Sequence, residues 1–390
     1  MSISKKLTLL VAVALCSTVV SAQIEVKAGD ETIKITPSGR VYMDGAFYLD
    51  DETKMGNGTN IPDVRIGLKA VYQKWDFKLD MGYANSKVSP KDIHIRYNID
   101  KTSFIKAGYY GELFGYEAWE STAYVKFNGK SPSTGAFESG RRIGVVYERW
   151  GKQYWMAAGV YGDGDAVNNT KEGNDGYAAT GRFLYTPFKE PGKIFHIGAS
   201  GTFRKADANG YDEDGKESAR TISYVASLGS TSIEKGKPVN ATISDADYQA
   251  KYNVELLGSY GPVFLVAEYY HTNVERKNSM PAFKGSGAYA QVGFLAIGDN
   301  YSYNDIDARL KTPKPKSLEL VARYDYLDLN DGHAQIYGGT MSTWAFAVNY
   351  YINKHVIAKV NYSHMSMGKK NPFAAGEDVS AIQGRFMIVF

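Results

Sequence analysis

The sequence predicts an all-β fold, a membrane-spanning antiparallel β-barrel of about 16 strands that run up and down. We expect short turns at its periplasmic end and long loops at its extracellular end. Three observations lead to this prediction. Apolar and polar residues alternate along most of the chain, the chain ends on an aromatic residue within such a stretch, and short connections alternate with long ones. Alternation is the period of a strand, whose side chains point to two opposite faces.

The alternation is clear at the C-terminus, in residues 382–390. Phe386 and Phe390 share one parity, whereas Gln383 and Arg385 lie on the other. Chain ends usually fray and carry polar residues, yet this one stops on phenylalanine. In an outer-membrane barrel the last strand pairs with the first, and its final aromatic residue lies at the membrane interface. The end resembles the assembly signal of bacterial outer-membrane proteins; the alternative is a buried last strand of a soluble β-sandwich.

The N-terminus predicts a secretory signal peptide over residues 1–22. Lys5 and Lys6 precede an apolar run, and small residues up to Ala22 offer a cleavage site. The run is too short for a spanning helix. Cys16 lacks the residues that usually precede a lipidated cysteine, so we expect no lipid anchor. Cleavage removes this only cysteine, which leaves no disulfide in the mature chain.

Composition limits the function only weakly. We expect a periplasmic N-terminal segment at 23–39 and the barrel at 40–390. The formal net charge of +3 falls by two when the signal lysines leave, so bulk charge indicates no polyanionic partner. The 30 tyrosines suit aromatic girdles and the 40 glycines suit turns and bends. A secreted all-β surface or adhesion protein could share this composition and stays an alternative.

Connection length orders the strands. Short and long connections alternate with one exception, the stretch 298–316, which is long where a short turn is expected. The number of strands is even only if the strand-like residues 221–226 are placed within the loop 205–246. Short turns are expected near residues 74, 100–101, 151–152, 190–192, 261–262 and 352–354. Long loops are expected at about 51–63, 84–91, 111–140, 162–175, 205–246, 275–285, 329–339 and 366–379.

Several runs resemble one known family. Residues 63–69 read Asp-Val-Arg-Ile-Gly-Leu-Lys, 90–97 read Pro-Lys-Asp-Ile-His-Ile-Arg-Tyr, and 105–109 read Ile-Lys-Ala-Gly-Tyr. Residues 318–325 read Leu-Glu-Leu-Val-Ala-Arg-Tyr-Asp, and 349–356 read Asn-Tyr-Tyr-Ile-Asn-Lys-His-Val. In order and spacing they are similar to the phosphate-selective porin O and P family. The resemblance implies a trimer of barrels in the bacterial outer membrane, with anions diffusing through each protomer past arginines and lysines.

Basic residues of the polar parity should face the lumen. A charged lumen favours counter-ions, and the planar fork of arginine matches phosphate oxygens. The basic inward residues are Arg65, Lys69, Lys78, His94, Arg96, Lys106, Arg142, Arg182, Arg323, Lys359 and Arg385, and the first six could form one basic wall. The candidate pore or anion-binding residues are Arg65, Lys69, Arg96, Lys106, Lys126 and Arg142.

A mixed lumen is the competing interpretation. Acidic residues lie on the same parity, and ion pairs inside a water-filled barrel are what a general, weakly selective pore would show. The inward acids are Asp76, Asp80, Asp92, Glu148, Glu255, Glu268, Glu319 and Asp325. Arg141 should lie at a loop edge, as an interface charge or as a contact of the constriction.

The loop 111–140 is long and rich in aromatic and acidic residues, among them Trp119, Glu120 and Tyr124. Loops of this length usually carry function. We expect it to fold into the barrel and narrow it; the alternative is an external loop over a trimer interface.

Other chemistries find little support in the sequence. The six histidines lack a nearby Gly-x-Ser-x-Gly motif, so we expect no enzyme. We expect no metal and no cofactor, although acidic residues in 162–175 could bind Ca²⁺ through hard oxygens. No basic helix or stacking motif indicates nucleic acid. The expected partners are outer-membrane lipid, lipopolysaccharide, small anionic or hydrophilic solutes and further copies in a homotrimer.

Overall fold

The computed structural model describes residues 23–28, 31–49, 55–84, 86–162, 172–208, 210–211, 213–218, 220–227 and 236–390. The predicted signal peptide, with Cys16, lies outside these residues. So do residues 163–171, the greater part of the loop that we considered for calcium.

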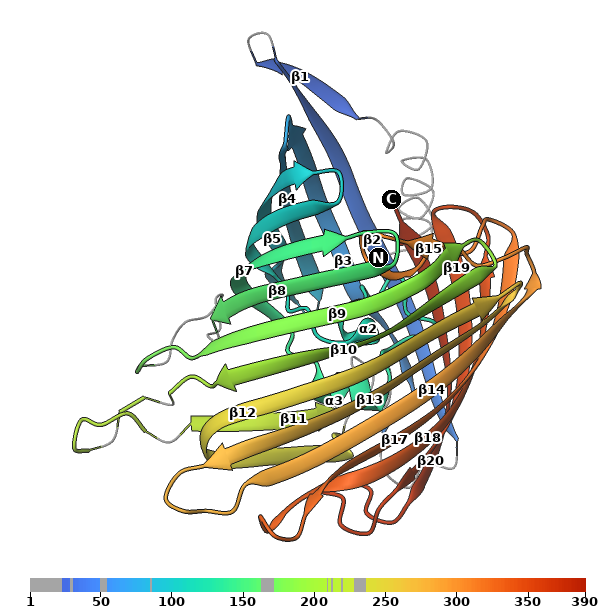
Figure 1. Cartoon of the computed structure of the whole chain (residues 1–390). Helices are drawn as coiled ribbons and strands as arrows, with labels where there is room; N and C mark the ends of the chain where they lie inside the picture. Colours follow the sequence, from blue (N-terminus) through green and yellow to red (C-terminus); the bar gives the residue numbers. More distant parts are fainter. Residues whose placement is uncertain are drawn as a thin grey trace.

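An antiparallel sheet closes into a barrel (Figure 1). Of the 18 strands in the sheet, β1 (Ile24–Ala28) is paired with β2 and β11 (Arg220–Ala226) with β12, each as an addition to the ring. The predicted ring of sixteen strands is therefore confirmed. The ring strands are β2 (Glu31–Leu49), β3 (Gly58–Tyr72), β4 (Trp75–Ala84), β5 (Lys87–Asp100), β6 (Ser103–Gly111), β7 (Arg141–Trp150), β8 (Tyr154–Gly162), β9 (Tyr177–Glu190), β10 (Lys193–Lys205), β12 (Val239–Tyr260), β13 (Val263–Arg276), β14 (Phe283–Ile297), β17 (Ser317–Asp331), β18 (Ile336–Tyr351), β19 (Val356–Met367) and β20 (Asp378–Val389).

The last strand closes the ring on the first, as the C-terminal pattern predicts. β20 pairs with β2 from Arg40 opposite Val389 onward. Gly39 and Phe390 exchange backbone hydrogen bonds of 2.8 and 2.9 Å. β2 itself begins at Glu31 rather than near Arg40, because its earlier residues continue the ladder with β1 and β3. Figure 1 shows β1 and this part of β2 standing beyond the rim of the barrel.

The apolar parity faces outward. Ile66 is 69% exposed and Phe386 is 39% exposed, whereas Arg385, beside Phe386 in the chain, is buried. A soluble sandwich would bury the apolar faces between two sheets, and this barrel does not. Within the described residues, no helix is both long and apolar enough to cross a membrane.

Connection lengths follow the expected alternation with three differences. The expected long loop at 329–339 is a short turn, because β17 ends at Asp331 and β18 begins at Ile336. The expected long loop at 84–91 is wrong, because Val88 and Ser89 still pair with Tyr83 and Gly82, so β5 begins at Lys87. The long stretch 298–316 folds back toward the barrel interior as a small hairpin of β15 (Tyr303–Asn304) and β16 (Arg309–Leu310). We call residues 298–316 the periplasmic hairpin. β11 lies in the 205–246 connection, as the even count requires.

Residues 112–140, which we call the inward segment, join β6 to β7 through the interior of the barrel. The segment contains two short helices, α2 (Tyr116–Trp119) and α3 (Pro132–Phe137), which Figure 1 shows among the strands. Its apolar side chains Phe114 and Phe137 are fully buried, and both contact Tyr270 of β13. This packing fills the part of the lumen near β13.

Candidate functional site

Two buried carboxylates on β13 and β17 hold the inward segment. We call these two strands the far wall, because they face β2 to β7 across the lumen. Glu268, on β13, accepts hydrogen bonds from the backbone N–H groups of Tyr116 at 2.7 Å and Glu117 at 3.0 Å. Asp325, on β17, accepts from the backbone N–H and the hydroxyl of Ser133, at 3.1 and 2.9 Å. Hydrogen bonds to a carboxylate are stronger than neutral ones, so the segment is fixed by its backbone.

Two lysines add further anchors. Lys126 of the segment pairs with Glu319 of β17 at 2.8 Å, and both side chains are buried. Lys359 of β19 donates a hydrogen bond to the backbone carbonyl of Val125 at 2.5 Å. Lys126 therefore joins the segment to the far wall.

The segment also reaches the first ring strand. Arg40 of β2 donates hydrogen bonds to the hydroxyls of Ser121 at 2.9 Å and Thr122 at 3.0 Å. The segment thus extends from β13 and β17 to β2 and divides the lumen. The part near β13 is packed, and the part along β2 to β7 stays open.

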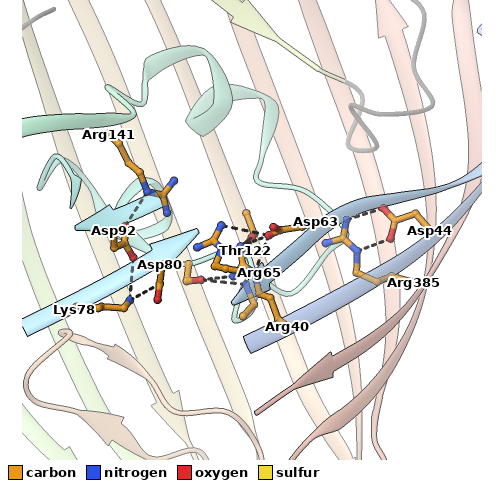
Figure 2. A network of polar contacts seen from close by, with 12 residues as sticks. Arg40, Asp44, Asp63, Arg65, Lys78, Asp80, Asp92, Thr122, Arg141 and Arg385 are labelled. Carbon is orange, nitrogen blue, oxygen red and sulfur yellow. Dashed lines mark hydrogen bonds and ion pairs between the residues drawn. The ribbon is translucent and has the colours of Figure 1, made fainter. Parts of the chain in front are cut away.

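The open part is a cavity of about 830 Å³. Lumen-facing side chains of β2 to β7 form one side, and residues of the inward segment form the other. Figure 2 shows part of the polar network of the strand side, together with Thr122 of the inward segment. Of the predicted site residues, Arg65, Lys69, Arg96 and Lys106 line this cavity, together with Lys78 and His94, so it contains all six residues of the predicted basic wall.

The other two predicted residues lie elsewhere. Lys126 is taken up by Glu319, and Arg142 is half-buried on β7; neither lines the cavity. Arg141, by contrast, does line it. Strand parity tells which side chains point inward, but not on which side of the inward segment they come to lie.

Carboxylates and cations alternate along the strand side of the cavity (Figure 2). Two carboxylates, Asp63 and Asp92, are each shared by two cations. The group around Asp63 keeps a local positive charge that can act on a solute, whereas Lys78 also pairs with Asp80 at 3.0 Å, which balances the group around Asp92. These groups are Asp63 with Arg40 and Arg65 (3.3 Å to Arg65), and Asp92 with Lys78 (3.0 Å) and Arg141 (2.8 Å). Further pairs are Arg385 with Asp44 (2.7 Å), Lys106 with Glu148 (2.8 Å) and Arg96 with Asp76.

Lys91 and Asp92 are adjacent in β5, yet both line the cavity. Successive strand residues normally point to opposite faces. The register of β4 and β5 shifts between Leu79 and Met81, and such a bulge re-aims side chains. Lys91 then lies against Gly82, where an added Cβ would be 2.4 Å from the lysine Cε. Sequence parity gave no means of finding Lys91, because the bulge has no local sequence signal.

The charge balance of the cavity is positive. Among the residues that the structure describes, the lining carries eleven lysines or arginines and nine aspartates or glutamates. In that same part of the chain, Lys69 and Lys91 make no ion pair. Both lysines can therefore offer their charge to a passing solute without giving up a protein partner.

The periplasmic hairpin enters the cavity from the periplasmic end of the barrel. The hydroxyl of Tyr303 lies 3.0 Å from His196 Nδ1, and Trp155 Nε1 donates to the carbonyl of Ile306 at 3.1 Å. These contacts bring Asp307 and Arg309 to the cavity. Sequence reasoning missed both residues, and the only signal for them was the unexpected length of 298–316.

Glu120 of the inward segment faces the cavity but is only 6% exposed. Burial raises the pKa of its carboxyl to about 7; Glu117 adds to the rise, whereas Arg309 and Lys126 oppose it. Over the described residues, no three His, Cys, Asp or Glu side chains are grouped as a metal site.

Comparison with known proteins gives distant relatives. A family model described as phosphate-selective porin O and P matches residues 37–390. Porin O of Pseudomonas aeruginosa is 21% identical over 94% of this chain and 91% of its own length. An uncharacterised protein of Caulobacter vibrioides is 23% identical over 83% of this chain, which spans only 66% of that relative's length.

Solved structures share the fold at low identity. The trimer form of in-vitro folded OmpT from Vibrio cholerae superposes with a TM-score of 0.58 at 11% identity, covering 92% of this chain and 99% of that one. An anion-selective porin from Comamonas acidovorans gives 0.56 at 11% identity, covering 92% and 100%. The closed barrel, the apolar outer face and the family match together show that this chain belongs to the phosphate-selective porin O and P family and forms a channel of the bacterial outer membrane.

Proposed function

We propose that this channel lets small hydrophilic solutes diffuse through the open part of its lumen and prefers anions, phosphate among them. One observation carries the proposal: all six residues of the basic wall line one cavity, opposite a segment that narrows the lumen. The Comamonas porin is described as anion-selective, and the name of the family includes phosphate.

The physical case rests on unneutralised charge. A unit charge about 4 Å from an anion is worth ~4 kcal/mol at an effective dielectric of 20. Conduction needs several such sites that are each weak enough to release the ion. Lys69 and Lys91 supply unpaired charge. Arg65 and Arg96 add planar guanidinium donors, which are paired with Asp63 and Asp76 of the same wall. In this proposal Lys106 extends the wall toward the segment, and Lys126 acts by positioning the segment.

The ion pairs of the wall favour a second candidate, a general pore with weak selectivity. Most cations of the cavity have a carboxylate within 3.3 Å. Reversal potential across a planar bilayer under a salt gradient separates the two candidates. A potential displaced toward the anion limit, with phosphate reducing the chloride current, supports the selective pore; a potential near zero supports the general one.

Changing Lys69 and Lys91 together to glutamine should lower the anion-to-cation permeability ratio by roughly threefold or more, since two charges beside the ion path are lost. Neither change leaves a carboxylate without its partner, so the barrel should fold normally. The matched control is Lys101→Gln with Lys354→Gln, two exposed lysines in short periplasmic turns. An equal fall in both double variants would contradict a specific role for the cavity lysines.

Acidification should strengthen the anion preference. The carboxyl of Glu120 has a raised pKa of about 7, so it is neutral below that pH and negative above it. A cavity that loses this negative charge is more positive, and the reversal potential should move toward the anion limit between pH 8.5 and 5.5. Glu120→Gln should show the low-pH value throughout. His94 also lines the cavity, so His94→Gln is the control, and it should retain the shift.

The same proposal includes a homotrimer whose outer faces contact outer-membrane lipid and lipopolysaccharide. The Vibrio structure is described as a trimer form, and the apolar outer face of this barrel suits either lipid or a neighbouring barrel. Static light scattering in mild detergent should give three times the mass of the mature chain. A mass of one chain in every mild detergent tested would count against the trimer.

A further inference from the structure

Two aromatic rings of the inward segment line the cavity, and each has a cation beside it. Arg309 Cζ lies 3.7 Å from the ring centroid of Tyr124. Lys106 Nζ lies 4.7 Å from the ring centroid of Trp119. Tyr124 is 37% exposed, so much of its side chain is open to solvent.

The two cations are fixed by elements outside the segment. Arg309 belongs to the periplasmic hairpin and pairs with Asp307 at 3.1 Å. Lys106 belongs to β6 and pairs with Glu148 at 2.8 Å. Each cation is therefore held by a carboxylate as well as lying beside its ring.

A cation beside a ring changes what the rest of the ring surface attracts. An aromatic face carries negative charge from the ring quadrupole, and a cation on that face offsets this charge. The ring surface that remains open is then less repulsive toward an anion. A planar group with negative charge can stack there, whereas an inorganic ion makes no use of the ring.

The size of the cavity agrees with an organic solute. Its volume of about 830 Å³ lies in the range of pockets that hold organic ligands of drug size. Unpaired lysines on the strand side, Lys69 and Lys91, supply attraction for an acidic group.

From these contacts we infer that the cavity recognises organic anions that carry an aromatic ring, with aromatic carboxylates as the simplest class. The ring lies against Tyr124 or Trp119, and the carboxylate is drawn by the basic wall. The inference rests on the proposed anion preference and adds to it a selection for the body of the solute.

Two anions of equal charge test this directly. Full-length protein is inserted in planar bilayers, and the chloride current is titrated with benzoate or with cyclohexanecarboxylate, which has a similar size and no aromatic ring. Benzoate should halve the current at a concentration about three- to tenfold lower, the usual worth of an aromatic pair. Equal half-blocking concentrations would overturn the inference.

Ring substitutions locate the effect. Tyr124→Leu combined with Trp119→Leu should bring the two half-blocking concentrations together, whereas Tyr124→Phe combined with Trp119→Phe keeps two rings and should preserve a difference. A benzoate preference that persists in the double leucine variant, with normal heat-modifiable migration, would refute the assignment to these rings. If the leucine variant does not insert, the phenylalanine variant still tests the inference, because loss of the preference with both rings present would contradict it. The proposed anion preference is tested separately by the reversal potential, and a potential that shows no anion preference would count against it. The ratio of the two half-blocking concentrations tests only the ring, because both blockers carry the same charge.

Discussion

Removing residues 115–135 and joining the ends by a short Gly-Ser linker should raise the single-channel conductance several-fold. The inward segment occupies the lumen between the far wall and β2, so its loss leaves a water-filled ring of sixteen strands. Conductance follows the open cross-section of the narrowest part. The ends are easy to join, because Phe114 and Phe137 both lie against Tyr270, with ring centroids 6.0 and 5.7 Å away.

The carboxylates that hold the segment should tolerate its removal. Glu268, Glu319 and Asp325 lose hydrogen-bond partners, but water enters the space and hydrates them, so the cost of a buried unpaired charge does not arise. Heat-modifiable migration in cold detergent checks that the barrel is folded. Shortening the β13–β14 connection at 277–282 is the matched control and should leave the conductance as it is. An unchanged conductance in the folded deletion variant would show that the segment does not limit the pore.

Gly39→Ala should impair closure of the barrel. An added Cβ at this position would lie 2.5 Å from Phe390 Cζ and 2.9 Å from the carbonyl oxygen of Arg65. The aromatic ring can rotate away, but the backbone oxygen belongs to the ladder with β3 and cannot. Overpacking of this kind costs about 1–3 kcal/mol, and here it also strains the two hydrogen bonds between Gly39 and Phe390.

The measurement is the midpoint of urea unfolding in detergent, together with the fraction of heat-modifiable protein in outer membranes. Gly258→Ala is the matched control, since an added Cβ there meets nothing within 4 Å. In the urea midpoint of refolded protein, Phe390→Ala in the Gly39→Ala background should restore part of the loss, because only the contact with Arg65 then remains. Equal urea midpoints for Gly39→Ala and Gly258→Ala would show that the pairing of the first and last strands tolerates a side chain at position 39.

Local sequence pattern was sufficient to predict the faces and the order of the strands. Arg385 and Phe386 point to opposite faces, as their parity requires. The terminal Phe390 forms backbone hydrogen bonds with Gly39 of the first ring strand. The strand-like residues 221–226 could be placed in a loop because an up-and-down barrel needs an even count. These are short-range rules, and the regular geometry of a barrel follows from them.

The division of the lumen could not be predicted in this way. Lys126 and Glu319 are paired across 193 residues of chain, and no local pattern marks such a contact. The same holds for Arg309, which reaches Tyr124 only because the periplasmic hairpin turns inward. Lys91 was hidden for a different reason, since a bulge reversed the face that parity assigned to it.

The bonds of residues 112–140 to strands from both ends of the chain set an order of events during biogenesis. The partners of this stretch include Arg40 near the start and Lys359 near the finish. Contacts so distant in sequence form late, because a long piece of chain must be brought together first. We therefore expect that a barrel without its final strands lacks a complete constriction and that control of permeability is established late in insertion.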